Sequence, residues 1–360
     1  MRKKKNITIL NVGDEVDYDS FKKLNKEKRF IASQGFEYRS AGYSEFLNGG
    51  MPEIPTKKAA IFFFFPFEYW NQHIEHRAYR GMYGNKHFYK KFEHFCKMLS
   101  EMVKKQLSGK EVILIDDPSL FLLGRDKAKV MGKLSGGKVP VPRRYRTRKI
   151  GDIEKLLGKG HKLYIKPRCG SMGKGITFLQ SGDWQTNFGF KNNKIISRKS
   201  DLGWKFHDVT GKKFFLEKLL KQNIYIEEGI EPFNIKGDKV DLRIYGFYDK
   251  IIYIYPRRNK IDEVTTNISQ GGKGDPSLLR VIPKRMVAQA KKTALKGMKA
   301  LGLYFAGIDV VIDSSLKETY IVDVNMFPGF PKRRTYNLSR RMITELKRLN
   351  HTGKLCFKKI

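Results

Sequence analysis

Hydrophobic positions in the first 115 residues alternate between the strand pattern and the helix pattern. Short apolar runs predict buried strands at 7–10, 60–65 and 112–115. Between the last two runs, apolar residues recur every three or four positions, which predicts a helix over 86–107. Strands and helices in alternation are typical of an α/β domain, and we expect one over residues 1–115.

The rest of the chain continues the mixture, with more strands than helices. Helices are predicted at 118–134, 150–157 and 284–301. Strands are predicted at 162–167, 214–218, 224–228, 240–248, 250–255, 305–312 and 319–325. Strands 240–248 and 250–255 indicate a hairpin that turns at Asp249 and Lys250. The expected fold class is therefore α/β (α+β).

Composition excludes several classes of protein. Apolar residues make up 40% of the 360 residues, which is enough for a packed core, so wholesale disorder is excluded. No stretch reaches the roughly 18 to 20 apolar residues that a transmembrane helix requires. The three cysteines have neither metal-site nor disulfide spacing. These features predict a reduced, cytoplasmic protein.

The charge balance is strongly basic. Lysine and arginine number 72 against 36 acidic residues, a formal net charge of +36, and such a field attracts polyanions. Two basic clusters stand out, one over 143–149 and one over 332–360, where ten basic residues face Glu345 alone. The excess predicts an acidic peptide or polymer as substrate, or nonspecific contact with nucleic acid. A solvated basic surface without a partner is the alternative.

A glycine-rich loop follows a predicted strand that ends in a lysine. The strand-end lysine and the loop residues are Lys166, Gly170, Ser171, Gly173, Lys174 and Gly175. Glycines let backbone N–H groups approach phosphate oxygens, and lysines supply positive charge. The Gly-Lys-Ser/Thr ending of a Walker A loop is absent. The pattern indicates a phosphate site, and a tight hairpin with solvated lysines explains it equally well.

The last two predicted strands contain isolated acidic and amide side chains among apolar residues. Asp323 and Asn325 are two positions apart, so they share one face of a strand, and Asp309 lies on the strand before. Three oxygen ligands from adjacent strands suit Mg²⁺, which shares phosphate oxygens and keeps several waters. A polar outer face on a half-buried hairpin is the alternative, although buried carboxylates need a partner.

A third group of polar residues lies on the predicted hairpin and after it. Asp241 and Arg243 share a strand face, and Arg258 ends the hairpin, where it could reach the same space. Thr266-Asn267 follows, with two glycines after it. A cross-strand ion pair with surface arginines would account for any one of these residues.

The order of these motifs resembles the ATP-grasp superfamily. A helix lysine precedes the strand lysine and its glycine loop; an acidic strand end, Asp-x-Arg, Thr-Asn with Gly-Gly, and Asp-x-Asn follow. Within the superfamily, the chain is most similar to the spore-coat-associated YheC/YheD group, and more distantly to RimK-type glutamate ligases. The resemblance covers about residues 117–335.

The resemblance implies a two-subdomain ATP-grasp domain over 116–335, with ATP between antiparallel sheets. Its glycine-loop subdomain would span about 150–225 and its metal subdomain about 226–335, before a basic C-terminal helix or tail over 336–360. The implied activity is an ADP-forming ligase that joins a carboxylate to an amine or thiol through an acylphosphate. The alternatives are a noncatalytic structural or assembly protein that binds nucleotide or polyanion, and an ATP-grasp kinase.

The resemblance also assigns roles by position. The implied ATP-binding residues are Lys127, Lys166, Gly170, Ser171, Gly173, Lys174, Gly175, Glu227, Glu228, Ile230 and Asp241. The implied catalytic residues, facing the γ-phosphate and the acyl acceptor, are Arg243, Arg258 and Asn267. The implied ligands of one or two Mg²⁺ ions, with Mn²⁺ as a substitute, are Asp309, Asp323 and Asn325.

Two positions depart from the superfamily pattern. Asp323 stands where the second metal carboxylate is usually Glu, and its shorter side chain leaves the number of metal ions open. Thr265 stands where RimK-type ligases have Arg, so glutamate is not carried over as the substrate.

Overall fold

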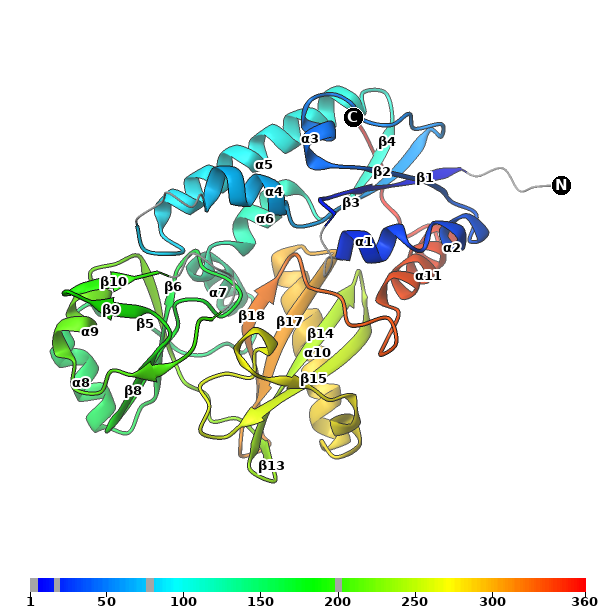
Figure 1. The fold of residues 1–360 in the computed structure, drawn as a ribbon. Helices are drawn as coiled ribbons and strands as arrows, with labels where there is room; N and C mark the ends of the chain where they lie inside the picture. The colour runs from blue at the N-terminus through cyan, green and yellow to red at the C-terminus, as the bar shows by residue number, and fades with distance from the viewer. Residues whose placement is uncertain (1–5, 16–19, 76–80, 198–202) are drawn as a thin grey trace.

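The N-terminal part of the chain forms a five-stranded sheet. The computed structural model describes residues 6–15, 20–75, 81–197 and 203–360 (Figure 1). The strand order is β19-β4-β3-β1-β2, in which β1 to β4 run parallel and β19 is antiparallel to β4. The strands are β1 (Ile7–Val12), β2 (Glu37–Ala41), β3 (Lys58–Phe63), β4 (Glu111–Ile115) and β19 (Lys358–Lys359). The three strands predicted in this region are confirmed as β1, β3 and β4.

Helices cover both faces of this first sheet. They are α1 (Ser20–Asn25), α2 (Lys28–Ser33), α3 (Tyr43–Leu47), α4 (Phe67–Tyr69), the π-helix η1 (Trp70–Ile74), α5 (Lys86–Gln106) and α11 (Leu338–His351). Alternate residues of β3 enter two hydrophobic clusters, Ile61 and Phe63 with α5, and Ala60 and Phe62 with α1, α2 and α11. The apolar run is continuous because both faces of the strand are buried.

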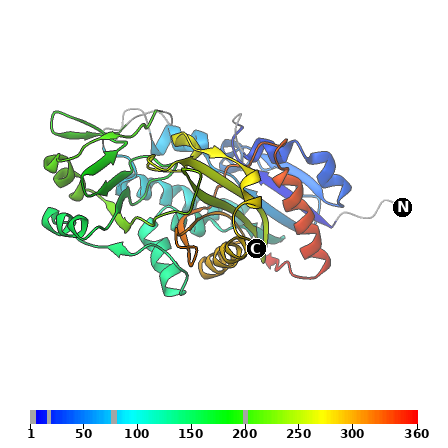
Figure 2. The same ribbon diagram turned by 90° about the horizontal axis from the view of Figure 1, so that it is seen from below.

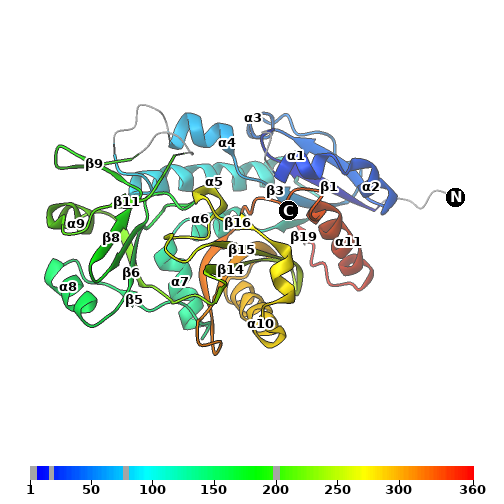
Figure 3. The same ribbon diagram turned by 60° about the horizontal axis from the view of Figure 1, so that its bottom comes forward.

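The second sheet is antiparallel and has the order β11-β8-β7-β6-β12-β5. Its strands are β5 (Arg144–Tyr145), β6 (Leu163–Pro167), β7 (Thr177–Gln180), β8 (Asp183–Thr186), β11 (His207–Asp208) and β12 (Ile224–Glu228). A small hairpin, β9 (Gly189–Lys191) and β10 (Lys194–Ile196), extends beside it. Figure 3 shows α8 (Ile150–Gly158) and α9 (Lys213–Leu220) outside this sheet.

The predicted strand over 214–218 is wrong, because this segment belongs to helix α9. Phe215, Leu216, Leu219 and Leu220 are its buried residues, and their spacing is helical. A short apolar run by itself does not separate a buried strand from a helix.

The third sheet contains the long hairpin and is also antiparallel. Its order is β16-β15-β14-β17-β18, with β13 paired to β14. The strands are β13 (Asn234–Ile235), β14 (Asp238–Phe247), β15 (Lys250–Lys260), β16 (Lys273–Gly274), β17 (Phe305–Ile312) and β18 (Thr319–Asn325). Two 3₁₀ helices, η2 (Ile268–Gln270) and η3 (Pro276–Arg280), flank β16. Helix α10 (Lys284–Leu301) packs on β14, β17 and β18 (Figure 2).

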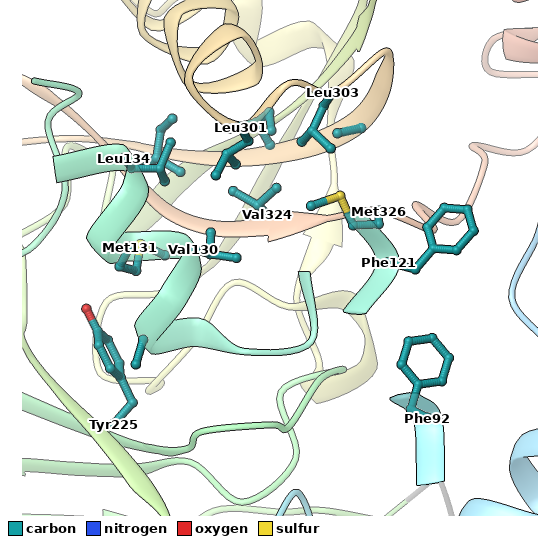
Figure 4. Packing of buried hydrophobic residues seen from close by; sticks show 14 of the residues in the cluster. Phe92, Phe121, Val130, Met131, Leu134, Tyr225, Leu301, Leu303, Val324 and Met326 are labelled. Atoms are coloured by element: carbon teal, nitrogen blue, oxygen red, sulfur yellow. The ribbon is translucent and has the colours of Figure 1, made fainter. Parts of the chain in front are cut away.

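Two helices connect the sheets. The helices α6 (Pro118–Gly124) and α7 (Lys127–Gly136) lie between the first sheet and the other two (Figure 1). Figure 4 shows Val130 and Leu134 of α7 near Val324 of the third sheet, with Tyr225 of the second sheet below α7. Residues of all three sheets belong to this hydrophobic cluster. The expected α/β (α+β) fold is confirmed.

The C-terminal segment returns to the N-terminal sheet. Helix α11 contacts α1, α2 and β15, and β19 pairs with β4. In the described part of the chain, no helix combines the length and the apolar character needed to cross a membrane.

A buried carboxyl group joins the first sheet to the third. Asp116 follows β4, and its Oδ1 accepts hydrogen bonds from the backbone N–H groups of Tyr304 (2.7 Å) and Phe305 (3.3 Å). Its side chain is buried, and burial raises the pKa of Asp116 to about 7 despite those hydrogen bonds.

We expect Asp116 to make stability fall as the pH rises. Since its pKa in the folded protein lies above the ordinary value of 3.8, the protonated form is favoured on folding, and that stability is lost between about pH 4 and pH 7. The full shift corresponds to on the order of 4 kcal/mol. Asp116→Asn keeps an acceptor and tolerates the φ of 66°. The melting temperature of the variant minus that of the wild type should increase from pH 4 to 7; a constant difference would contradict this.

Candidate functional site

A cavity of about 140 Å³ lies between the second and third sheets. The predicted site residues that line it are Lys127, Lys166, Gly170, Ser171, Gly173, Lys174, Glu227, Glu228, Ile230, Asp241, Asn267, Asp309 and Asp323. The predicted residues that do not line it are Gly175, Arg243, Arg258 and Asn325. Most of the motifs recognised in the sequence therefore meet in one space.

The wall formed by the third sheet is charged, and its opposite face is apolar. Arg243 of β14 lies opposite Asp309 of β17, which lies opposite Asp323 of β18. Side chains alternate between the faces of a strand, so the intervening Leu242 and Ile308 point the other way and are buried in the hydrophobic cluster with α10. The fold thus places the charged residues of three strands on one surface.

Two arginines neutralise Asp309. Arg243 donates through Nε and Nη2 to both carboxylate oxygens, with Nη2 at 2.8 Å from Oδ2. Arg257 places Nη2 at 3.1 Å from Asp309 Oδ2 and donates through Nε to Asp241 Oδ1 at 2.8 Å. Burial alone would raise the pKa of Asp309, but the two guanidinium groups outweigh burial and hold the pKa below its ordinary value.

Arg257, which we did not predict, occupies the place expected for Arg258. Arg257 is 4% exposed and lines the cavity. Arg258 lies opposite Val240 in the register, so it points to the other face, where it contacts Asp238 (2.9 Å) and Asp275 (3.4 Å). The structure brings Arg257 to the site and leaves Arg258 outside it.

Lysines reach the cavity from two other elements. Lys127 is the first residue of α7, and its Nζ donates to Asp323 Oδ1 at 2.8 Å. Burial alone would lower the pKa of Lys127, but the Asp323 carboxylate raises it above the ordinary value. Lys166 on β6 forms an ion pair with Glu227 on β12. Each cation is held in place by an acidic partner.

Polar atoms without partners remain in the cavity wall. Among the described residues, Glu227 Oε2 and Thr265 Oγ1 are buried and have no hydrogen-bond partner. Both residues line the cavity. Buried polar atoms are costly unless hydrogen-bonded, so these two fit a polar ligand such as a nucleotide.

Four residues of the glycine loop 170–175 line the cavity, and we call this loop the lid. Met172 accepts a hydrogen bond at 3.1 Å from Ser269 Oγ, which belongs to η2 beside the third sheet. Lys174 lines the cavity, but its Nζ lies 3.4 Å from Glu75 Oε1 and above the ring of Tyr83. Its ammonium group therefore also contacts the N-terminal part of the chain.

The carboxylates suit a cation that also binds phosphate. In the described residues, no three His, Cys, Asp or Glu side chains are grouped to hold a metal ion. Asp309 and Asp323 are direct cross-strand neighbours. Asn325 donates through Nδ2 to the carbonyl of Gly307 at 3.4 Å, which leaves its amide oxygen for a cation. Two carboxylates and an amide fit Mg²⁺, which completes its shell with water and phosphate oxygens.

Two antiparallel sheets enclosing this cavity, a glycine lid from one sheet and paired carboxylates from the other define an ATP-grasp protein. The family model for YheC/D like ATP-grasp matches residues 124–349. The chain therefore belongs to the YheC/D-like ATP-grasp family, as the resemblance of its motifs predicted.

Curated relatives share part of this region. A probable alpha-L-glutamate ligase of Pseudomonas fluorescens (strain SBW25) is 32% identical over 110 residues, 31% of this chain and 32% of that protein. The corresponding protein of Photobacterium profundum is 33% identical over 110 residues, again 31% of this chain and 32% of that protein. The chain thus matches about a third of the length of these relatives.

Solved structures share the fold over nearly the whole chain. D-cycloserine synthetase DcsG matches with a TM-score of 0.56 at 13% identity, over 94% of this chain and 99% of that chain. The ATP-grasp ligase PsnB, complexed with precursor peptide PsnA2 and AMPPNP, matches with a TM-score of 0.53 at 14% identity, over 94% and 96%. At these identities, the likeness establishes the fold.

Proposed function

We propose that the chain is an ATP- and Mg²⁺-dependent ligase that joins a carboxylate to an amine, or to a thiol, and releases ADP and phosphate. The observation that carries this proposal is that Lys127, Arg257 and the aspartates Asp309 and Asp323 share one cavity with a glycine lid. Phosphoryl transfer depends on positioning and charge neutralisation, which such a cavity provides without a protein nucleophile. The ligase names of the curated relatives and of PsnB support the assignment.

The proposed reaction has two steps. A carboxylate oxygen of the first substrate attacks the γ-phosphorus of ATP, the bond from that phosphorus to the bridging oxygen breaks, and ADP leaves. The amine of the second substrate then attacks the carbonyl carbon of the acylphosphate, loses a proton, and phosphate leaves. Both steps move negative charge between oxygens, so cations at fixed positions lower the barriers.

This scheme gives a role to Lys127, Lys166, Arg243 and Arg257. Lys127 and Lys166 would contact the α- and β-phosphates, exchanging their present partners for phosphate oxygens. Arg257, which is held by Asp241, would stabilise the transferring phosphoryl group, and Arg243 orients Asp309. The Glu227–Glu228 strand end and Ile230 would receive the adenine, Asp241 would lie near the ribose, and Asn267 would face the acyl acceptor.

The metal residues complete the proposal. Asp309, Asp323 and Asn325 would hold Mg²⁺, which supplies positive charge at the phosphates when bound. A structure of PsnB with its minimal precursor was solved with Mg and ADP, which is consistent with this cofactor pair.

The proposal is tested by incubating the protein with ATP, Mg²⁺ and pools of amino acids, peptides and amines. A ligase should release ADP only with a competent pair and give a product lighter by one water than the two substrates together. A phosphorylated product would support the kinase alternative. Absence of ADP with all pools would favour a noncatalytic binding protein.

We also propose that one substrate is an acidic peptide or polymer. Four of the ten basic residues of the C-terminal cluster are used in folding: Arg333 and Arg340 pair with the buried Glu27, and Arg341 and Arg348 pair with the buried Glu345. The cluster over 143–149 differs. Its five members are exposed and form no ion pair within the described residues.

The 143–149 cluster also lies next to the proposed adenine site. The backbone N–H of Glu228 donates to the carbonyl of Arg143 at 2.9 Å, and Arg144 lies opposite Glu227 in the register. Burial lowers the pKa of Arg148, and the charge of Arg144 lowers it further. The two guanidinium groups are therefore close enough to affect each other. Unneutralised cations at this edge favour an anionic partner.

We expect salt to weaken binding to poly-L-glutamate steeply, and the loss of Arg144 and Arg148 to reduce that dependence. Arg144→Ala/Arg148→Ala should bind about tenfold more weakly at low salt, with a shallower plot of log affinity against log salt, because fewer counterions are released. Lys291→Ala/Lys292→Ala, which removes two exposed charges from α10, is the control. Equal effects in both variants, or a flat salt response in the wild type, would reject the acidic substrate. Stronger binding to DNA of equal charge would favour nucleic acid.

A further inference from the structure

Three consecutive residues between α6 and α7 contact three different parts of the site. Arg125 follows α6, Asp126 caps α7 through its side chain, and Lys127 begins that helix. Arg125 contacts Ser171 in the lid, Asp126 contacts the strand end that carries the lid, and Lys127 contacts β18 of the opposite sheet. This tripeptide, which we call the joint, therefore spans both walls of the cavity.

The contacts from the joint to the lid are well formed. Arg125 Nη1 donates to Ser171 Oγ at 2.7 Å. Arg168 donates through Nε and Nη2 to the two oxygens of Asp126, each at 2.8 Å, and the N–H of Lys127 donates to the Arg168 carbonyl at 3.0 Å. Paired, charge-assisted hydrogen bonds of this kind fix direction as well as distance.

Arg125 is an unusual residue for a core position. It is 8% exposed, and its guanidinium group lies 4.3 Å from the ring centre of Trp70, with Phe65 and Phe92 also nearby. Within the described residues, its one side-chain hydrogen bond is to Ser171. Burial lowers the pKa of Arg125, so the protein holds a costly cation here. Core packing alone does not require a guanidinium group at this position.

The N-terminal domain holds the lid from the other side. Tyr83 Oη accepts from the Ser171 N–H at 3.2 Å and lies 3.1 Å from Ser171 Oγ. The N–H of Cys169 donates to the carbonyl of Gly84 at 3.0 Å. A Cβ at Gly84 would lie 2.7 Å from Pro167 Cβ and 2.8 Å from the nitrogen of Gly170, so this close approach requires glycine.

We propose that Arg125 and Asp126 are positioning residues that order the glycine lid for nucleotide. Arg125 acts through Ser171, which Tyr83 also holds. Asp126 acts through Arg168. The inference rests on the proposed function only in naming the ligand of the lid. Three glycines in six residues make this loop costly to order, and a tether that orders it beforehand reduces the loss of entropy on binding. Since Lys127 belongs to the same joint, the ordered lid is also set at a fixed position relative to Asp323.

The first readout does not depend on activity. Hydrogen–deuterium exchange of the protein without nucleotide should be about tenfold faster or more over 168–176 in Arg125→Ala and Tyr83→Phe, because a buried hydrogen bond to the lid is lost. Exchange in α10 and β17 should stay unchanged. Tyr83→Phe loses only a hydroxyl and keeps the ring below Lys174, so it tests the tether even if Arg125→Ala fails to fold.

Two further variants separate positioning from general stability. Asp126→Asn retains the helix cap but loses the bidentate carboxylate, so it should also loosen 168–176. Arg125→Lys keeps a donor and a charge and should restore part of the protection. Arg340→Ala, which removes an exposed arginine paired with Glu27 far from the lid, is the control and should leave lid exchange unchanged.

The second readout is binding of AMPPNP with Mg²⁺ by calorimetry, together with steady-state kinetics. Tyr83→Phe and Asp126→Asn should raise the Kd and the KM for ATP about tenfold while kcat changes less than threefold. A uniform rise in exchange across the protein, or a fall in kcat with KM unchanged, would overturn the positioning role. If the wild type binds no nucleotide, the proposed function fails, and the exchange results still decide whether the joint orders the lid.

Discussion

Replacing Arg257 by Ala should reduce kcat for ADP formation about a thousandfold, while replacing Arg258 by Ala should change it less than threefold. A cation that stabilises a transferring phosphoryl group is worth about 10³-fold or more. Arg257 is 4% exposed and faces the cavity, whereas the Arg258 side chain is 41% exposed and pairs with Asp238 and Asp275. Two adjacent arginines thus form a natural comparison.

A conservative pair of variants guards against unfolding. Arg257→Ala leaves two buried aspartates without their shared partner, which is destabilising. Arg257→Lys keeps the charge but loses the planar, bidentate geometry, so it should fold and still lose about a hundredfold in kcat. Arg258→Lys should resemble the wild type. If Arg258→Lys lost activity and Arg257→Lys did not, Arg258 and not Arg257 would be the catalytic arginine.

Replacing Asp323 by Ala should lower kcat/KM at saturating Mg²⁺ by about a hundredfold or more. The change removes both a carboxylate opposite Asp309 and the partner of Lys127. Loss of one group that fixes charge at a reacting phosphate costs on the order of 10² to 10³. Turnover should be measured as ADP release over a range of Mg²⁺ concentrations, where the apparent Mg²⁺ affinity should also fall.

Two variants sharpen the test of Asp323. Asp323→Glu restores the residue usual in the superfamily and should retain measurable activity, with a changed ratio of Mn²⁺ to Mg²⁺ support. Glu318→Gln removes an exposed charge from the turn of the same hairpin and should have no effect. Undiminished ADP release by Asp323→Ala would remove the metal assignment.

The sequence predicts strands β17 and β18 accurately, because they combine long apolar runs with isolated acidic residues. The predicted strands 305–312 and 319–325 and the helix 284–301 agree with β17, β18 and α10 at both ends. The short strands of the region 177–213 were not predicted, since two- to four-residue strands carry too few residues to establish a period.

The structure places Arg257, and not the predicted Arg258, in the site, and the register of the hairpin explains why. From the turn, Phe247 pairs with Lys250, and a regular hairpin would continue to place Lys239 opposite Arg258, on the face of Asp241. A β-bulge beside Tyr245 and Gly246 adds one residue to β15, so Arg257 comes opposite Asp241 instead. A shift of one residue moves every later side chain to the other face. Nothing in the local sequence locates such a bulge.

The joint was also missed, for a different reason. Lys127 was recognised through its place in the order of motifs, but the side chains of Arg125 and Asp126 contact partners more than 40 positions away. Pattern and spacing describe neighbours along the chain, and they contain no information about a turn that meets a distant loop.

The packing of α11 and β19 against the N-terminal sheet has a practical consequence for truncated forms of the protein. Leu338, Met342 and Leu346 of α11 share a hydrophobic cluster with Phe21 and Leu24 of α1. A fragment of residues 1–115 would expose the hydrophobic surface of α1 and leave the β4 edge of the sheet unpaired, and both features promote aggregation. Deleting residues 336–360 should therefore destabilise the N-terminal sheet before the rest of the protein.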